Sequence, residues 1–235
     1  MKIISSTSIS SLNKSVVATL VAEINALLKA QNRVVLCVPG GRSVVGIFEL
    51  LKTAAIPWEK IHLFLADERR VPLADKESNF YLVQSTCIGE LIKKNLLPKA
   101  NVHPYIVKQS ADAGIGGYNK EFLEYGGACD ILLLSSGEDG HVGSLYPNHE
   151  SVKSNAEEYI LVNESPKPPA GRMSLSRKLM ENARVAILLF YGEAKQDAYR
   201  RFLDKKLTSR ECPAKVVEAA KKAYVFTDLA GYRII

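Results

Sequence analysis

Short apolar runs alternate with longer segments of helical periodicity along the chain, and this alternation restricts the possible folds most strongly. Strands are expected at residues 33–38, 61–66, 101–106, 131–134, 158–162, 185–190 and 223–226, and helices at residues 10–30, 44–53, 78–93, 112–125, 176–182, 192–204 and 213–220. Such alternation is typical of a mostly parallel sheet with helices on both faces. We therefore expect an α/β fold that begins with a helix and enters its sheet at residue 33.

The domain organisation follows from what is missing between these elements. No change of composition, linker or internal repeat divides the 235 residues. The proline-rich piece at residues 165–169 is too short to join two domains of this size, and a loop near a functional site suits it better. One α/β domain is expected over residues 1–235. Ligands of such folds bind beyond the carboxyl ends of the strands, so we expect the functional residues in the loops that follow strands.

Charge and composition narrow the possible partners and the location. The net charge of +6 suggests a nucleic-acid partner, but Lys and Arg are spread along the chain and usually lie near acids. A solvated basic surface, or attraction of a small anionic substrate, explains the charge better, and no nucleic-acid partner is expected. The apolar patch at residues 16–22 has polar flanks, unlike a signal peptide, and no run reaches the roughly 18 to 20 apolar residues of a membrane span. A cytoplasmic protein is expected.

The four cysteines are far apart in the sequence and form no CxxC pair: Cys37, Cys87, Cys129 and Cys212. Two of them lie in or beside apolar strand-like runs, where a thiol behaves as a small hydrophobic group. We expect all four to be reduced and structural.

The first candidate loop is Pro39-Gly40-Gly41-Arg42-Ser43, which closes a strand and opens a helix. The two glycines allow close approach of the backbone, and amides at a helix N-terminus favour an anion such as phosphate. The loop contains neither GxGxxG nor the Gly-Lys-Ser/Thr of a P-loop, so neither a dinucleotide nor a nucleoside triphosphate is indicated. A tight turn with Ser43 as the helix cap explains the same residues equally well.

The second candidate loop, Asp67-Glu68-Arg69-Arg70-Val71-Pro72, follows the next strand along the chain, with Ser78 and Asn79 a few residues later. Mixed charges at a strand end often form a structural ion-pair cluster. This cluster, however, is expected at the same edge of the sheet as the glycine loop. An arginine there can hold a phosphate through paired donors.

The third candidate is GEDGH, residues 137–141, directly after an apolar strand. Its glycines permit a sharp loop, and His141 has the side chain whose ordinary pKa suits proton transfer near neutrality. Asp139, two residues earlier, is placed to orient the ring. A packing role is the ordinary explanation of an isolated histidine, as for His62 and His103, but the glycine-flanked strand end favours a functional role for His141.

The fourth candidate combines two segments expected in loops, residues 172–176, Arg-Met-Ser-Leu-Ser, and residues 192–195, Gly-Glu-Ala-Lys. Each offers a cation beside a strand or a helix start. Lys195 near the first turn of its helix is unfavourably placed against the helix dipole, which suggests a ligand role, although a surface lysine is the ordinary alternative. No HExxH spacing and no GxSxG elbow occur, so neither a metal site nor a serine nucleophile is expected.

Taken in order, these motifs resemble the 6-phosphogluconolactonase family, in the superfamily that includes glucosamine-6-phosphate deaminase. The resemblance covers nearly the whole chain from the glycine loop, and its carriers include Trp58, Asp130 to Leu134, Ser144 to Pro147, Pro168-Pro169 and Gly192, besides the candidate loops. Residues 142–147, Val-Gly-Ser-Leu-Tyr-Pro, are similar to the lactonases, whereas deaminases typically carry an aromatic-Asn-Glu segment there. One departure is Arg42, where many members have a hydroxyl residue; it adds a phosphate contact or points to solvent.

The resemblance implies a modified Rossmann-like fold and hydrolysis of 6-phospho-D-glucono-1,5-lactone, without a metal or organic cofactor, by a monomer or a small homo-oligomer. His141 would be the general base and Asp139 its orienting partner, while the substrate and its phosphate would be bound by Gly40, Gly41, Arg42, Ser43, Asp67, Arg69, Arg172 and Lys195. Glu138 is left without a role. A glucosamine-6-phosphate deaminase is the nearest alternative enzyme. A sugar-phosphate-sensing domain is the non-catalytic alternative, for which an attached DNA-binding helical module would be expected.

Overall fold

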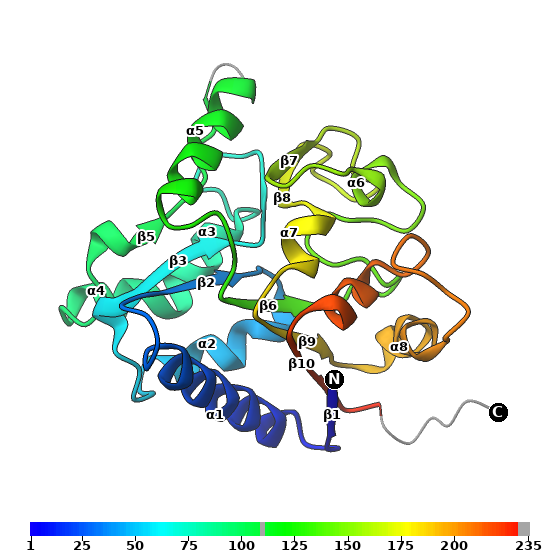
Figure 1. Cartoon of the computed structure of the whole chain (residues 1–235), viewed down its shortest axis with the longest axis horizontal. Coiled ribbons are helices and arrows are strands. Elements are labelled where there is room, and N and C mark those ends of the chain that lie inside the picture. The colour runs from blue at the N-terminus through cyan, green and yellow to red at the C-terminus, as the bar shows by residue number, and fades with distance from the viewer. Residues whose placement is uncertain (109–110, 230–235) are drawn as a thin grey trace.

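The fold was analysed in a computed structural model that describes residues 1–108 and 111–229. Its central sheet contains β1 (Lys2–Ser5), β2 (Val34–Val38), β3 (Ile61–Leu65), β5 (Val102–His103), β6 (Ile131–Ser135), β9 (Val185–Phe190) and β10 (Lys222–Thr227). The strands lie in the order β1-β10-β9-β6-β2-β3-β5, and every neighbouring pair is parallel (Figure 1). This confirms the predicted mostly parallel α/β fold.

The direction of chain progression reverses between β2 and β6. From β2 the chain proceeds to β3 and β5 on one side, and β6, β9 and β10 then follow on the other side. At such a switch point the loops after two neighbouring strands part and leave a crevice at their carboxyl ends. The glycine loop follows β2 and GEDGH follows β6, so the topology brings both motifs to this crevice.

Helices lie on both sides of the sheet, with α1 and α2 on one side and α5 and α7 on the other (Figure 1). The helices are α1 (Ile9–Leu27), α2 (Val45–Leu51), α3 (Asn79–Val83), α4 (Gly89–Lys93), α5 (Ala111–Glu124), α6 (Glu150–Lys153), α7 (Arg177–Glu181) and α8 (Gln196–Leu203). A π-helical segment, Gln84–Ile88, joins α3 to α4, and 3-10 helices at Arg42–Val44 and Glu193–Lys195 precede α2 and α8. The helix expected at residues 213–220 is a 3-10 helix, Pro213–Ala219. Within residues 1–108 and 111–229, no helix combines the length and apolarity that crossing a bilayer requires.

A second, antiparallel sheet of three strands lies beyond the carboxyl ends of the main one. It contains β4 (Asp67–Arg69), β8 (Arg172–Leu175) and β7 (Tyr159–Val162), in the order β4-β8-β7. The expectation that residues 67–69 and 172–175 are loops was therefore wrong. Their charged and hydroxyl side chains hide the strand pattern because these strands carry polar groups into a cavity. The strand expected at residues 158–162 exists, but it belongs to this small sheet.

Two further expectations were wrong at the edges of the main sheet. The chain does not enter the sheet first at residue 33, because β1 precedes α1 and pairs with β10. β1 contains only two consecutive apolar residues, Ile3 and Ile4, and three of its four residues are exposed, so its apolar run is too short for periodicity to detect. The strand expected at residues 101–106 is reduced to two residues beside β3. The central strands β2 and β9 are buried at every position, and periodicity finds such strands readily.

The candidate active site

A cavity of about 230 Å³ lies at the carboxyl ends of the central strands. It is lined by Pro39, Gly40, Gly41, Arg42, Ser43, Asp67, Arg69, Asn79, Ser135, Ser136, Gly137, Glu138, His141, Gly143, Lys167, Arg172 and Lys195. Every residue that the sequence suggested for the site is in this set, except Asp139. Asp139 does not line the cavity itself, but its carboxylate is hydrogen-bonded to the ring of His141, which does.

The glycine loop after β2 comes close to the start of α3. A Cβ on Gly40 would lie 1.9 Å from Oδ1 of Asn79, so a larger residue would displace that amide. Gly41 has φ +94°, a conformation that favours glycine, and precedes the 3-10 helix that begins at Arg42. Arg42 is exposed at the rim of the cavity, whereas Ser43 is half-buried and faces Lys195.

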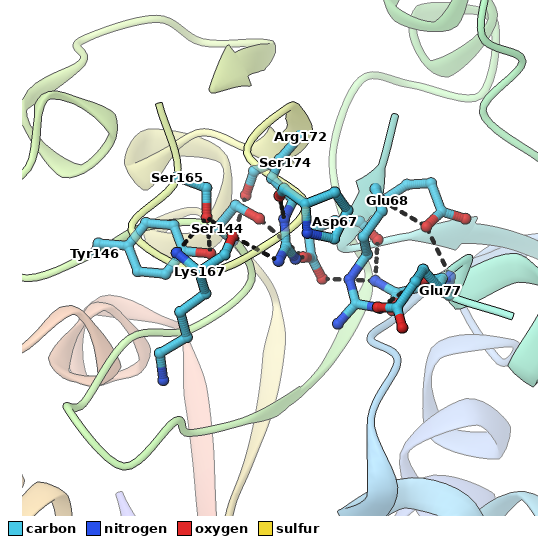
Figure 2. A network of polar contacts seen from close by, with 12 residues as sticks. Asp67, Glu68, Glu77, Ser144, Tyr146, Ser165, Lys167, Arg172 and Ser174 are labelled. Atoms are coloured by element: carbon cyan, nitrogen blue, oxygen red, sulfur yellow. Dashed lines mark hydrogen bonds and ion pairs between the residues drawn. The ribbon is translucent and has the colours of Figure 1, made fainter. Parts of the chain in front are cut away.

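Asp67 on β4 belongs to a network of hydrogen bonds that connects the segments at the floor of the cavity (Figure 2). Its carboxylate accepts hydrogen bonds from Oγ of Ser144 at 2.9 Å and from Nδ2 of Asn79 at 3.2 Å. The backbone N–H of Ser144 in turn donates to Oγ of Ser174 on β8 at 3.1 Å. One buried carboxylate thus joins β4, the loop that follows His141 and the start of α3.

Glu68 fixes the start of α3 from below the cavity. Its carboxylate accepts hydrogen bonds from the backbone N–H groups of Arg69, Asn79 and Phe80 at 2.6 to 2.8 Å, and from Oγ of Ser78 at 2.8 Å. Burial raises the pKa of Glu68 even though these donors act to lower it. A carboxylate at the N-terminus of a helix satisfies amides that have no partner within the helix. Asn79 is thereby held at the cavity wall.

Arg172 on β8 is almost completely buried, and it holds a proline-rich loop in place. Its Nε donates to the carbonyl of Pro169 at 2.9 Å, and one terminal nitrogen donates to the carbonyl of Pro168 at 2.9 Å. The other terminal nitrogen lies 3.9 Å from the carboxylate of Asp67. Arg172 therefore anchors residues 167–169 over the cavity, besides contributing positive charge to its wall.

Arg69 and Lys167 add two further cations to the cavity. Arg69 donates to the backbone carbonyl of Glu77 at 2.5 Å, and no hydrogen-bond partner is found for its buried Nε among the described residues. The backbone N–H of Lys167 donates to Oγ of Ser165, which also lies 2.8 Å from the carbonyl of Lys167. Nζ of Lys167 lies 3.9 Å from the carboxylate of Asp139, so the loop held by Arg172 delivers a cation beside the histidine pair.

The GEDGH segment forms a tight turn that folds His141 back over the end of β6. The N–H of Gly137 donates to the carbonyl of His141 at 2.8 Å, and Gly140 has φ +85°. From α8, Arg201 donates to the carbonyl of Asp139 at 2.8 Å. The turn is thus closed on itself and fastened to a helix, so that the imidazole has a fixed place at the cavity.

His141 and Asp139 form a hydrogen-bonded pair. Nδ1 of His141 lies 2.5 Å from Oδ1 of Asp139, and the ring is largely buried with its centroid 4.9 Å from that of Tyr146. Burial raises the pKa of the Asp139 carboxyl, but the hydrogen bond and the charge of His141 outweigh it and hold that pKa well below its usual range. An ionised Asp139 accepts the Nδ1 proton, which leaves Nε2 as the proton acceptor.

Lys195 lies at the opposite wall, between the loops that follow β2 and β6. Its Nζ donates to Oγ of Ser43 at 3.0 Å and to Oγ of Ser135 at 2.8 Å. Burial lowers the pKa of Lys195 to about 8, although the carboxylate of Glu138 acts against this shift. An ammonium group has three donors, so one remains for a ligand. Glu138, which had no role in the sequence, is thus an electrostatic neighbour of Lys195.

The charge balance of the cavity favours an anionic ligand. Five cationic side chains line it, those of Arg42, Arg69, Lys167, Arg172 and Lys195, against the two carboxylates of Asp67 and Glu138. A concave wall with one dominant sign of charge concentrates ligands of the opposite sign. In residues 1–108 and 111–229, no group of three or more metal-ligating side chains is gathered at one point.

Comparison with known proteins identifies the family. The family model described as glucosamine-6-phosphate isomerases/6-phosphogluconolactonase matches residues 7–226. The chain belongs to this family. A 6-phosphogluconolactonase from Borreliella burgdorferi is 33% identical over 191 residues, which are 81% of this chain and 81% of the relative. This agreement confirms the family resemblance that the ordered motifs indicate.

Solved structures with a similar fold come from proteins with different activities. The structure of a 6-phosphogluconolactonase from Thermotoga maritima has a TM-score of 0.82 at 24% identity and covers 96% of this chain and 97% of its own. A monomeric glucosamine-6-phosphate deaminase has a TM-score of 0.81 at 19% identity, covering 99% of this chain and all of its own. At these identities the likeness concerns the fold alone.

Asn79, Ser135 and Lys167 also line the cavity, but the sequence assigns none of them to the site, although Asn79 stands near the second candidate loop. Ser135 ends β6, so the rule that ligands bind after strand ends points to it. Asn79 follows the helix cap Ser78, and its amide became visible as a site residue only through its contacts with Asp67 and Gly40. Lys167 lies in the proline-rich loop that the sequence placed near a site, without naming the lysine.

Proposed function

We propose that this protein hydrolyses the ring ester of 6-phospho-D-glucono-1,5-lactone to 6-phospho-D-gluconate, in the oxidative pentose phosphate pathway. The observation that carries the proposal is the His141–Asp139 pair, which faces a cavity with five cationic side chains. A base beside an anion site is what hydrolysis of a phosphorylated lactone requires. The similarity to the 6-phosphogluconolactonase of Borreliella burgdorferi supports the same assignment.

In the proposed mechanism, Nε2 of His141 removes a proton from a water molecule as the water oxygen attacks the lactone carbonyl. The tetrahedral intermediate then collapses, the bond from the carbonyl carbon to the ring oxygen breaks, and His141 returns the proton to that oxygen. Asp139 keeps the ring in the required tautomer and stabilises the imidazolium. Water is consumed, and one hydroxyl and one carboxylic acid are formed; the acid becomes a carboxylate by releasing a proton to solvent. The step therefore needs no redox partner and no covalent nucleophile.

Phosphate binding is assigned to the cationic wall. Lys195 offers its third donor, and Arg172 contributes a buried guanidinium held rigidly by carbonyl groups. Hydrogen bonds to the phosphate and to the developing oxyanion come from the amides of Gly40 and Gly41 and from the side chains of Ser43 and Arg69. Arg42 at the rim attracts the anionic substrate. Asp67 acts by holding Ser144 and Asn79 in place. We place the reaction in the cytoplasm, carried out by a monomer or a small homo-oligomer without a metal or organic cofactor.

The test is a lactonase assay in which the lactone is generated in situ and its loss is followed at neutral pH. His141→Ala is expected to lower kcat by about 100- to 10,000-fold, the usual contribution of one general base. The product 6-phosphogluconate should still bind, because the cationic wall is intact. His62→Asn, which removes a histidine outside the cavity, is the matched control and should keep wild-type turnover. Near-wild-type turnover of His141→Ala would remove His141 from the mechanism.

The alternative activity, deamination of glucosamine 6-phosphate, is supported by the family model, which includes glucosamine-6-phosphate isomerases, and by the shared fold of the monomeric deaminase. Glucosamine 6-phosphate is therefore supplied in a parallel assay with ammonia as the readout. Ammonia release without accelerated loss of the lactone would replace the proposed function. Binding of both sugar phosphates without turnover of either would support the sensing domain.

A further inference from the structure

A second concave surface lies alongside strand β7 and shares no lining residue with the candidate active site. It is a groove of about 580 Å³ lined by residues of α5, of α6, of β7 and of the segment that follows β7. These elements are labelled in Figure 1. β7 is an edge strand, because the small sheet runs β4-β8-β7 and, among residues 1–108 and 111–229, no further strand pairs with the outer side of β7. An edge strand presents backbone groups that another extended chain can bind.

The direction of these backbone groups follows from the contacts of Tyr159. The side-chain amide of Asn119 on α5 accepts from the N–H of Tyr159 at 2.8 Å and donates to its carbonyl at 3.1 Å. Both backbone groups of Tyr159 therefore point away from β8. Backbone direction alternates along a strand, so the N–H and C=O of Leu161 point the same way, into the groove. Among the described residues, neither group of Leu161 has a hydrogen-bond partner.

The pairing on the other side of the sheet gives the same result independently. Leu175 lies opposite Tyr159, and its N–H donates to the carbonyl of Ala66 at 2.8 Å, on the side away from β7. Tyr159 and Leu175 are thus a pair without mutual hydrogen bonds, as the contacts of Asn119 require. Asn119 acts as a one-residue substitute for a neighbouring strand. Because β7 ends at Val162, the backbone groups of Leu161 are those that remain open on its outer edge.

The charge of the groove determines which partner fits. Three carboxylates line it, those of Glu150, Glu158 and Glu164, and in the part of the chain that the structure describes no Lys or Arg lines it. Glu150 is paired with Lys153, but Glu164 is exposed and has no ion-pair partner among the described residues. The whole chain has a net charge of +6, whereas the groove is negatively charged. This local negative charge favours a cationic partner.

We propose that the groove along β7 binds an extended, basic peptide segment of a partner protein, which adds a strand to the small sheet by pairing with the backbone of Leu161. Pairing of main chains gives the affinity, and the lysine or arginine side chains of the peptide reach the carboxylates at the rim. A second copy of this chain does not fit as well, because a twofold pairing of β7 with itself would bring the same carboxylates face to face.

The test uses purified full-length protein and a fluorescein-labelled six-residue peptide of alternating lysine and valine, followed by fluorescence polarisation. Saturable binding is expected, with loss of at least tenfold in affinity when every amide of the peptide is N-methylated, because two or more backbone hydrogen bonds are then lost. A peptide of alternating glutamate and valine should bind at least tenfold more weakly, because its charges repel the groove.

Variants of the protein separate the backbone contribution from the charge. Leu161→Pro removes the outward N–H and should weaken binding about fivefold or more, while folding is kept because an edge strand tolerates proline where its N–H faces outward. Glu164→Lys should weaken binding roughly two- to fivefold, and Glu124→Lys, the same change on α5 outside the groove, should leave it unchanged. Circular dichroism confirms that each variant is folded.

Three results would overturn the proposal. They are the absence of saturable binding to the wild-type protein, equal binding of the N-methylated peptide, and affinity unchanged by both Leu161→Pro and Glu164→Lys. Sedimentation of the wild-type protein alone provides a fourth, because a dimer that Leu161→Pro abolishes would assign the edge to a second copy. None of these measurements depends on the proposed lactonase activity.

Discussion

The imidazole ring of His141 lies directly over the Cα of Gly137, where a Cβ would come within 2.0 Å of the ring. The same glycine donates its N–H to the carbonyl of His141 at 2.8 Å. Gly137 therefore leaves the space in which the histidine folds back over the strand end and meets Asp139. The first glycine of GEDGH is required for the position of the ring as well as for the turn.

Gly137→Ala is therefore expected to displace the ring without removing any chemical group. Loss of alignment by about 1 Å can lower turnover about 100-fold, so kcat should fall by that order while the affinity for 6-phosphogluconate is kept. Gly116→Ala on α5 is the matched control, because a Cβ there meets open space. The lactonase assay and a binding titration of the product measure the two effects. A wild-type kcat for Gly137→Ala would contradict the positioning role.

Asp139→Asn tests the second contact of the histidine. The amide occupies the same volume but carries no charge to stabilise the imidazolium that forms during the reaction. In a Ser-His-Asp triad the same change at the carboxylate beside the histidine lowers kcat by about 10,000-fold. We expect a loss in kcat of about 100- to 10,000-fold here, with little change in KM. If instead KM rises while kcat is unchanged, Asp139 contributes to substrate binding and the proposed pairing is wrong.

Lys195 gives the phosphate site a dependence on pH. Burial lowers its pKa to about 8, so the ammonium is mostly charged at neutral pH and loses its proton as the pH rises through 8. The phosphate of 6-phosphogluconate is already a dianion in this range, so affinity for the product should decrease above about pH 8. Calorimetric titrations of product across that range measure the effect. Lys195→Arg should abolish the decrease, because arginine stays protonated; an unchanged pH dependence in this variant would contradict the assignment.

Glu68 supports the site through stability rather than chemistry. Glu68→Gln keeps the shape of the side chain but replaces an acceptor oxygen with an amide that faces the N–H groups at the start of α3. We expect the free energy of unfolding to fall by about 2 to 4 kcal/mol, because buried donors lose a charged acceptor. Urea denaturation measures the change, and Glu77→Gln on the exposed side of the same loop should change stability by less than about 0.5 kcal/mol. Equal effects of the two changes would refute the role of Glu68.

The sequence predicts the fold best where burial is complete on both faces. The buried runs of β2, β6 and β9 are continuous and apolar, and the loops after them contain most of the site. β4 and β8 could not be predicted, because Asp67 and Arg172 use strand geometry to direct charged groups inward. Their pairing depends on contacts that local periodicity does not contain, such as that between Asp67 and Ser144, which are 77 residues apart.

The pair of His141 and Asp139 shows the opposite case, because its partners are two residues apart and lie in one turn. Short spacing after a strand end makes such a contact predictable from the sequence. Lys167 shows the limit of this reasoning. Its place beside Asp139 depends on Arg172 and Ser165, which hold the loop through backbone carbonyls, and side-chain identity alone does not reveal such bonds.

His62 on β3 makes the fold sensitive to acid at a point outside the active site. Its Nδ1 lies 3.1 Å from Nε2 of His103, whose other ring nitrogen lies 2.7 Å from the carboxylate of Glu121, and its ring packs against Tyr125. Burial, with smaller effects from the charges of His103 and Arg33, lowers the pKa of His62 from 6.5 to about 4. The folded protein therefore binds this proton less readily than the unfolded chain.

Stability from a neutral His62 is consequently complete above pH 6.5, the unfolded pKa, and is lost as the pH falls toward 4. His62→Phe keeps an aromatic ring in place without a titratable group, so the free energy of unfolding should fall less steeply for this variant between about pH 7 and about pH 4.5. Urea denaturation of both proteins at several pH values in this window measures the two slopes. Because the remaining titratable groups are common to both proteins, parallel slopes would mean that His62 titrates normally and would contradict the prediction.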